Sequence, residues 1–175
     1  IVFHDYSLKR LCNLEKNGAE MHSNELRQIN LLDTKSKIPT LEEMFYQVDS
    51  RVPILIEIKS GFNPIIEERL VELTRTYQGE VAFQSFDQKA CEWFRDNAPY
   101  YNTGLIISSN EIKKNTIQEL NIDFIAVDIN NIESKDVQNL RKNNLPTFTW
   151  TINNDEKLKL SQKFADNCIF ENLLI

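Results

Sequence analysis

The sequence has little of what would keep a chain unfolded, carry it across a membrane or bind it to a polyanion. Only 4 glycines and 5 prolines occur in 175 residues, while 41% of residues are apolar and 26% charged. This composition excludes collagen-like, low-complexity and disordered chains. No apolar run approaches the roughly 20 residues that span a bilayer, and no signal-peptide pattern opens the chain. The net charge of −6 opposes binding to phosphate backbones, so we expect neither a nucleic-acid partner nor membrane insertion.

Cysteine is also scarce, and its placement excludes two further classes. Cys12, Cys91 and Cys168 are odd in number and far apart, and no CxxC pair occurs, so we expect neither a zinc knuckle nor a dithiol redox motif. Unpaired thiols are typical of reducing compartments, and with the absent signal they favour a cytoplasmic location. A chain of this length buries about 70% of its unfolded surface and needs no disulfide scaffold.

Short β-branched and aromatic runs alternate with longer amphipathic stretches, and strict alternation predicts parallel strands joined by right-handed crossovers. We expect strands at 1–3, 54–58, 81–86, 103–107, 124–128, 147–151 and 168–170. We expect helices at about 40–49, 64–77, 87–96, 111–120, 133–143 and 154–164. Candidate helix caps are Thr40, which opens a capping box with Glu43, and Asp87, Asn110, Ser134 and Asn154.

Two parallel layouts fit this alternation, an open doubly wound sheet and a closed TIM (β/α)8 barrel. The open sheet usually begins with a glycine-rich turn, which is absent here. A barrel normally takes about 200–250 residues, and this chain supplies about six of its strands plus a leading segment that already reads as strand interior. We therefore expect one α/β domain over residues 1–175, a TIM barrel lacking about its first two strands, with a polar insertion over about residues 8–37.

Glu57 lies within an otherwise apolar predicted strand, and in parallel α/β folds the chemistry gathers where the strands end. It alternates with Ile56 and Ile58 and so points to the opposite face. A buried carboxylate needs a partner, and a hard cation such as Mg²⁺ or Ca²⁺ would suit it. The alternative is an ion pair with Lys59, which shares its face of the strand.

Only two histidines occur, and His4 alone directly follows an apolar run. An imidazole exchanges a proton near neutral pH, as acid–base catalysis requires, and Asp5 could orient the ring. A structural histidine at a strand end fits the same pattern. His22 lies in the polar insertion, where we expect a solvated loop residue. Trp150 lies late in another predicted strand. Its large ring could line a pocket against an apolar part of a substrate or pack in the core.

Six motifs, in order, resemble the glycerophosphodiester phosphodiesterase family. They are Val2-Phe3-His4-Asp5 with Leu8 and Arg10, Glu25-Leu26, Ile38 to Glu43, Ile56 to Lys59, Ser85-Phe86-Asp87, and Trp150 to Asn153. The resemblance implies a TIM barrel whose characteristic insertion corresponds to about residues 8–37. It also implies a hydrolase of lipid and glycerol metabolism, which cleaves a glycerophosphodiester into sn-glycerol 3-phosphate and an alcohol.

The resemblance further implies roles for four residues. His4 matches one of two histidines that act as acid and base, and Glu57 matches the third of three carboxylates that hold a divalent cation (Mg or Ca, with Mn possible). Lys59 matches a lysine lining the phosphate pocket, and Trp150 an aromatic residue at the pocket mouth. The family's other histidine and two carboxylates would precede Ile1, so we expect residues to be missing upstream and residues 1–175 alone to be inactive.

Two other functions are also compatible with the sequence. One is a non-catalytic barrel remnant that binds a phosphorylated ligand, and the other is a lysophospholipase D-type phosphodiesterase. No serine–histidine–aspartate order, HExxH or phosphate-binding glycine loop occurs. The oligomeric state and the head group are not predicted.

Overall fold

The structure, a computed structural model, describes residues 1–59, 61–108 and 114–173. The chain divides into two compact units, one of Ile1–Val52 with Glu72–Glu80, the other of Pro53–Val71 with Val81–Ile175. Each unit is described below with its own contacts. The assignment of residues 1–175 to one domain stays a prediction.

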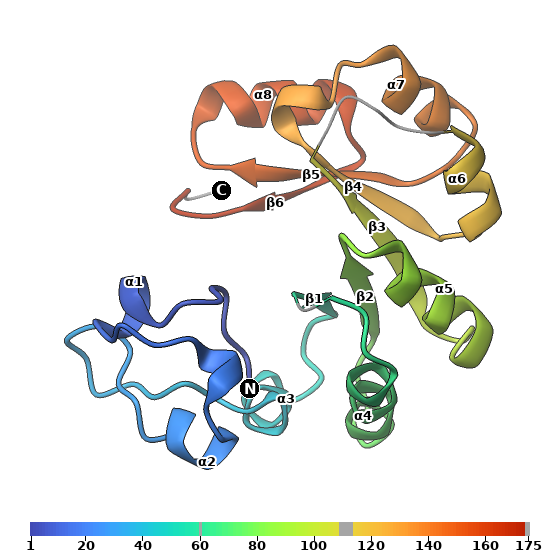
Figure 1. Cartoon of the computed structure of the whole chain (residues 1–175). Helices are drawn as coiled ribbons and strands as arrows, with labels where there is room; N and C mark the ends of the chain where they lie inside the picture. The colour runs from blue at the N-terminus through green and yellow to red at the C-terminus, as the bar shows by residue number, and fades with distance from the viewer. Residues whose placement is uncertain (60, 109–113, 174–175) are drawn as a thin grey trace. The chain divides into compact units, whose positions relative to one another are not determined.

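A six-stranded parallel sheet forms the centre of the second unit (Figure 1). Its strands are β1 (Ile54–Ile58), β2 (Val81–Ser85), β3 (Asn102–Ile107), β4 (Phe124–Asp128), β5 (Thr147–Ile152) and β6 (Asn167–Phe170). They follow one another in the sheet in chain order, and every neighbouring pair is parallel. The α/β class and its parallel sheet are therefore confirmed, and all six carboxyl ends lie at one edge of the sheet.

Helices connect successive strands, as the alternation predicts. They are α4 (Pro64–Thr74), α5 (Gln88–Asn97), α6 (Lys114–Leu120), α7 (Lys135–Lys142) and α8 (Asp155–Phe164), with a 3₁₀ turn, η2 (Ile129–Asn131), after β4. Three predicted caps are confirmed: Asp87, Ser134 and Asn154 accept hydrogen bonds from the amides of Lys89, Val137 and Lys157. The predicted cap Asn110 lies outside the described residues.

Alternation along the strands gives the sheet two different faces. Ile58 and Phe83 pack with Val71 of α4 and Phe94 of α5. Further along the sheet, the same face packs into a second apolar cluster. Strands β3 and β4 and helix α7 contribute to it Leu105, Ile107, Ile125, Val127, Val137 and Leu140. The helices therefore cover this face, and the intervening residues of each strand point to the other one.

On that other face, Glu57 is the register partner of Gln84, and Gln84 is the partner of Gly104. Gly104 in turn lies beside Phe124, whose ring stacks on Phe148 with centroids 5.1 Å apart. A Cβ atom at Gly104 would overlap the Phe124 ring. The glycine therefore provides the space that this aromatic pair occupies.

The first unit holds α1 (Lys9–Cys12), the 3₁₀ turn η1 (Gly18–Glu20), α2 (Ser23–Leu26) and α3 (Leu41–Val48). The prediction of a strand at residues 1–3 is wrong, because these residues carry no strand pairing. The amide of Val2 donates to the carbonyl of Pro39 at 2.9 Å, but a single bond does not make a ladder. An apolar run becomes a strand only where a neighbouring strand pairs with it along its length.

The predicted insertion has a small core of its own. Leu8, Leu26 and Ile38 are fully or almost fully buried together. Beyond the insertion, Thr40 and Glu43 form the predicted capping box at the start of α3. A stretch without clean periodicity therefore still folds, because a few well-spaced apolar residues are enough to close a compact loop region.

Candidate functional site

His4 is the outer member of a short chain of charged contacts in the first unit. Its Nδ1 lies 2.6 Å from Oδ1 of Asp5. The guanidinium of Arg10 donates to both oxygens of the same carboxylate, from Nε to Oδ2 and from Nη2 to Oδ1, each at 2.7 Å. Hydrogen bonds from Arg10 and His4 hold the pKa of Asp5 far below its usual range, so Asp5 is ionised at neutral pH.

An ionised carboxylate can only accept hydrogen bonds. The Nδ1 atom of His4 must therefore carry the proton that it shares with Asp5, which places the lone pair of the neutral ring on Nε2. The His4 side chain is 69% exposed, unlike a histidine packed in a core. The geometry is that of an oriented, solvent-accessible imidazole, the arrangement that proton transfer requires.

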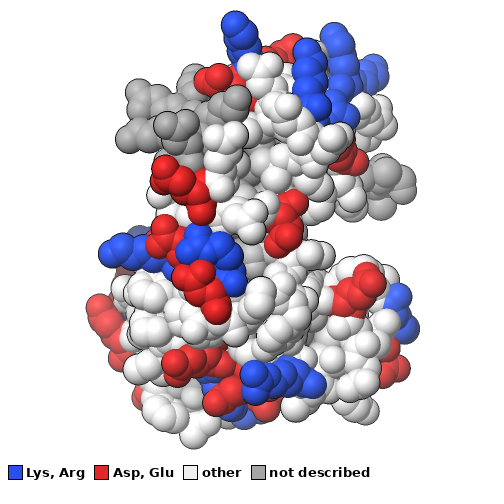
Figure 2. Space-filling model, turned by 90° about the vertical axis from the view of Figure 1, so that its right-hand side faces the viewer, with Lys and Arg blue, Asp and Glu red and all other residues white. Residues whose placement is uncertain are grey.

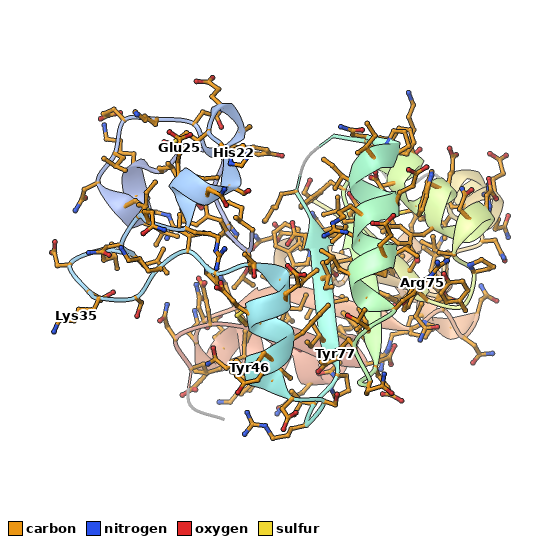
Figure 3. The ribbon with its side chains drawn as sticks, turned by 90° about the horizontal axis from the view of Figure 1, so that it is seen from below. His22, Glu25, Lys35, Tyr46, Arg75 and Tyr77 are labelled. Carbon is orange, nitrogen blue, oxygen red and sulfur yellow. The ribbon has the colours of Figure 1, made fainter. Side chains whose placement is uncertain are left out.

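The other histidine has a local role. His22 is exposed, as predicted, and its Nδ1 accepts a hydrogen bond from the amide of Asn24 at 3.2 Å. The carboxylate of Glu25 accepts one from the amide of His22 at 3.0 Å. Figure 3 shows the two labelled residues together at α2. His22 thus caps a helix, which the sequence did not predict because histidine is an uncommon capping residue.

Glu57 and Lys59 meet at the carboxyl end of β1. Lys59 Nζ lies 2.8 Å from Oε1 of Glu57, and the two side chains are 30% and 26% exposed respectively. The ion pair expected as the alternative to a metal ligand is therefore present. Among the residues that the structure describes, no group of three His, Cys, Asp or Glu side chains is placed to hold a metal ion. Glu57 by itself offers one carboxylate, an oxygen ligand that suits a hard cation.

Trp150 lies on β5, near the carboxyl edge of the sheet. Its indole Nε1 donates to the carbonyl of Ala126 on β4 at 3.0 Å. Its ring meets Phe86, which directly follows β2, with centroids 5.7 Å apart and planes at 86°. Trp150 is only partly buried, and Phe86 is 48% exposed. The pair is thus an accessible aromatic surface rather than part of the core. The sequence analysis included Phe86 in a family motif but assigned it no role.

Ser85 and Asp87, which flank Phe86, have structural roles. Ser85 Oγ donates to the carbonyl of Ile58 at 3.1 Å and accepts from the amide of Asp87 at 3.1 Å. Asp87 caps α5 and its Oδ2 also accepts from the amide of Phe62 at 2.8 Å. These bonds tie the segment after β1 to the end of β2 and so fix where Phe86 leaves the sheet.

Glu67 of α4 is a second residue that the sequence did not single out. It is fully buried, and neither carboxylate oxygen has a hydrogen-bond partner. Burial raises the pKa of Glu67, and the charge of Asp87 acts in the same direction. Its position in an amphipathic helix gave no signal of burial, because charged helix residues are usually exposed.

The surface carries both signs of charge. Figure 2 shows acidic and basic side chains mixed over much of the face in view, with a group of Lys and Arg side chains at its upper right. No helix in the described part of the chain is long and apolar enough to cross a membrane.

The parallel sheet, the crossover helices and the polar and aromatic residues at its carboxyl edge define an α/β protein of the TIM-barrel-like class. The model of the glycerophosphoryl diester phosphodiesterase family matches residues 1–172. The chain therefore belongs to this family of enzymes.

A curated relative agrees with this assignment, and solved structures share the fold. The glycerophosphodiester phosphodiesterase of Caldanaerobacter subterraneus is 25% identical over 174 residues, which cover 91% of this chain and 70% of the relative. The fold matches an Oleispira antarctica phosphodiesterase solved with the product sn-glycerol-3-phosphate, with a TM-score of 0.84, 19% identity, and coverage of 96% of this chain and 74% of that one. A Thermotoga maritima glycerophosphodiester phosphodiesterase matches with a TM-score of 0.72 and 21% identity, over 96% and 74% of the two chains.

Proposed function

We propose that the protein hydrolyses glycerophosphodiesters to sn-glycerol 3-phosphate and an alcohol, with His4 as a proton-transfer group. The observation that carries the proposal is the Arg10–Asp5–His4 chain of contacts, at 2.7 and 2.6 Å. It fixes the protonated nitrogen of His4, so the lone pair that would exchange a proton with a substrate is on Nε2. The match to the family model supports the choice of substrate class.

Phosphodiester cleavage needs a proton for the departing alkoxide or a base for the attacking water. An imidazole can serve either step, and such a group contributes about 10²- to 10⁴-fold in rate. Of the two histidines, His4 is the one whose ring nitrogen contacts a carboxylate, while His22 uses its Nδ1 to cap α2. The proposal therefore assigns the proton transfer to Nε2 of His4.

A divalent cation is the second part of the proposal. Glu57 would be one of its oxygen ligands, with Mg²⁺, Ca²⁺ or Mn²⁺ as candidates. When bound, such an ion would offset the negative charge that develops on the phosphate oxygens. Lys59, at 2.8 Å from Glu57, would bind a phosphate oxygen of the substrate, because its ammonium group is already placed at the carboxyl edge of the sheet.

The experiment measures release of glycerol 3-phosphate from glycerophosphocholine and glycerophosphoethanolamine. His4→Ala should reduce kcat/KM at least about 10²-fold. His22→Ala is the matched control, since it removes the other histidine and should leave turnover within a few-fold. Near-normal turnover by His4→Ala would contradict the assignment.

The cation is tested on the same protein. Chelation with EDTA should remove activity and an added divalent ion should restore it, while calorimetry should show weaker Mg²⁺ or Ca²⁺ binding by Glu57→Gln. Unchanged ion binding by that variant would exclude Glu57 as a ligand. A folded protein that binds glycerol phosphate without turning over any diester would instead be a binding protein, and turnover only of long-chain lysolipids would indicate a lysophospholipase D.

A further inference from the structure

Gln84 is a polar side chain buried on the face of the sheet that the helices do not cover. It lies on β2, one residue before the strand ends, and is only 5% exposed. None of the residues that the structure describes gives its buried Oε1 atom a hydrogen bond. Native proteins keep few such atoms, and an ion, a water molecule or a catalytic role usually accounts for them.

The side chain of Gln84 lies beside that of Glu57. The two residues are register partners on neighbouring parallel strands, and each is the next-to-last residue of its strand. Their side chains therefore leave the same face of the sheet. Neighbouring strands lie about 4.8 Å apart, and glutamate and glutamine side chains have the same length. The terminal oxygens of the two residues can thus reach the same height above the sheet, near its carboxyl edge.

The polar surroundings of Gln84 are on the side of β1. On the other side its register partner is Gly104, which has no side chain, and the Phe124 ring fills the space above that glycine. On β1, Lys59 Nζ lies 2.8 Å from Oε1 of Glu57. A positive charge is therefore stabilised beside the carboxylate, while the amide oxygen of Gln84 stays without a donor.

An amide oxygen next to a carboxylate suits a hard divalent cation. Ca²⁺ is bound in proteins by carboxylates together with the carbonyl oxygens of Asn and Gln side chains, and Mg²⁺ also takes oxygen ligands. A neutral amide adds an oxygen to such a site without the repulsion that a second carboxylate would bring. A cation would also give Oε1 the partner that the protein does not provide.

We propose that Gln84, through Oε1, is a further ligand of the divalent cation that Glu57 would hold. The inference rests on the proposed function and adds to it a neutral ligand on β2. Strands β1 and β2 then each supply one oxygen to the same ion. The burial of a polar side chain at this position follows from that role.

Calorimetry with Ca²⁺ or Mg²⁺ alone, without substrate, tests the inference. Gln84→Met removes the amide oxygen and keeps the length of the side chain. It should weaken binding about tenfold or more, the loss found even for residues that only support a metal ligand. Gln84→Glu provides an oxygen again and should bind the ion at least as tightly as the unmodified protein. Gln88→Met, at an exposed glutamine in the first turn of α5, is the matched control and should leave binding unchanged.

Urea unfolding separates a ligand from a residue that supports the sheet. Because Oε1 has no partner in the protein, Gln84→Met should be at least as stable as the unmodified protein without the ion. It should gain less stability from added Ca²⁺, since an ion that binds the folded state stabilises it in proportion to its affinity. Two results would overturn the inference: equal ion affinity of Gln84→Met and Gln88→Met, or weaker binding by Gln84→Glu than by the unmodified protein.

Glu57→Gln distinguishes a failure of this inference from a failure of the proposed function. If Glu57→Gln weakens ion binding and Gln84→Met does not, Gln84 is not a ligand, and the cation at Glu57 is unaffected. If neither variant weakens binding, or the unmodified protein binds neither ion, the proposed cation at Glu57 is refuted and the role of Gln84 with it.

Discussion

The carboxylate of Asp5 contacts two side chains, the imidazole of His4 at 2.6 Å and the guanidinium of Arg10 at 2.7 Å. The arginine keeps the carboxylate ionised, and the ionised carboxylate can only accept from His4. Arg10 thus acts on His4 through Asp5. A charged surface pair of this kind adds little to stability, so its consequence is the orientation of the ring.

Asp5→Asn should therefore lower kcat about 10²-fold with little change in KM, because an amide can donate to Nδ1 and allow the wrong tautomer. Nitrogen NMR of the imidazole checks this directly, since the protein should show a protonated Nδ1 and the variant a mixture. Glu25→Gln is the control, as it alters the carboxylate beside the other histidine. A variant with lower kcat but an unchanged tautomer would refute the proposed role of Asp5.

The sequence predicted which residues share a face of one strand better than it predicted which residues of different strands touch. Alternation alone placed Glu57 opposite Ile56 and Ile58 and on the same face as Lys59, because a strand has a fixed period of two. The contact of Phe86 with Trp150 could not be predicted in this way. It depends on how the sheet curves over the four strands from β2 to β5, which no local sequence pattern determines.

Lys59→Met should weaken the binding of inorganic phosphate or glycerol 3-phosphate by about tenfold or more, the loss expected for a hydrogen bond to a charged group. It should not weaken Mg²⁺ binding, because it removes a positive charge from beside Glu57. Calorimetry with each ion separates the two effects. Lys142→Met, in the last turn of α7, is the control. Equal phosphate affinity of the Lys59 and Lys142 variants would exclude Lys59 from the phosphate site.

Gly104→Ala should lower the free energy of unfolding by about 1–3 kcal/mol, the usual cost of overpacking a core. The new methyl group would overlap the Phe124 ring, which already stacks on Phe148. Gly61→Ala is the matched control, because the nearest atom to its Cβ would be Oδ2 of Asp87 at 4.0 Å. Urea unfolding of both variants measures the difference. A Gly104→Ala variant as stable as the Gly61→Ala control would show that the Phe124 ring moves aside without cost.

The burial of Glu67 could not be predicted from the sequence. Its place in α4, next to Glu68 and Arg69, is typical of an exposed helix face. In the structure Glu67 is fully buried with both carboxylate oxygens unpartnered, while Glu68 is exposed. Which acidic residue of a helix points inward depends on how the helix rotates against the sheet, and the charge pattern does not determine that rotation.

The buried carboxyl group should make stability depend on pH. Its pKa in the folded chain is raised above the ordinary value of 4.5, so the folded state retains a proton that the unfolded state loses. The contribution of the protonated Glu67 to the free energy of unfolding is therefore complete below about pH 4.5. It is lost as the pH rises through the pKa of Glu67 in the folded state. Glutamine does not titrate and leaves no buried charge, so Glu67→Gln should remove this dependence.

Urea unfolding of the protein and of Glu67→Gln between pH 4 and pH 8 measures the effect. As the pH rises from 4 to 8, the free energy of unfolding of the variant should increase by about 1 kcal/mol or more relative to that of the parent. This is the cost of burying a polar group without a hydrogen-bond partner. Glu68→Gln, at the exposed neighbouring position, should follow the parent at every pH. Parallel stability curves for the parent and Glu67→Gln would mean that Glu67 ionises freely in the folded chain, and that α4 admits water to it.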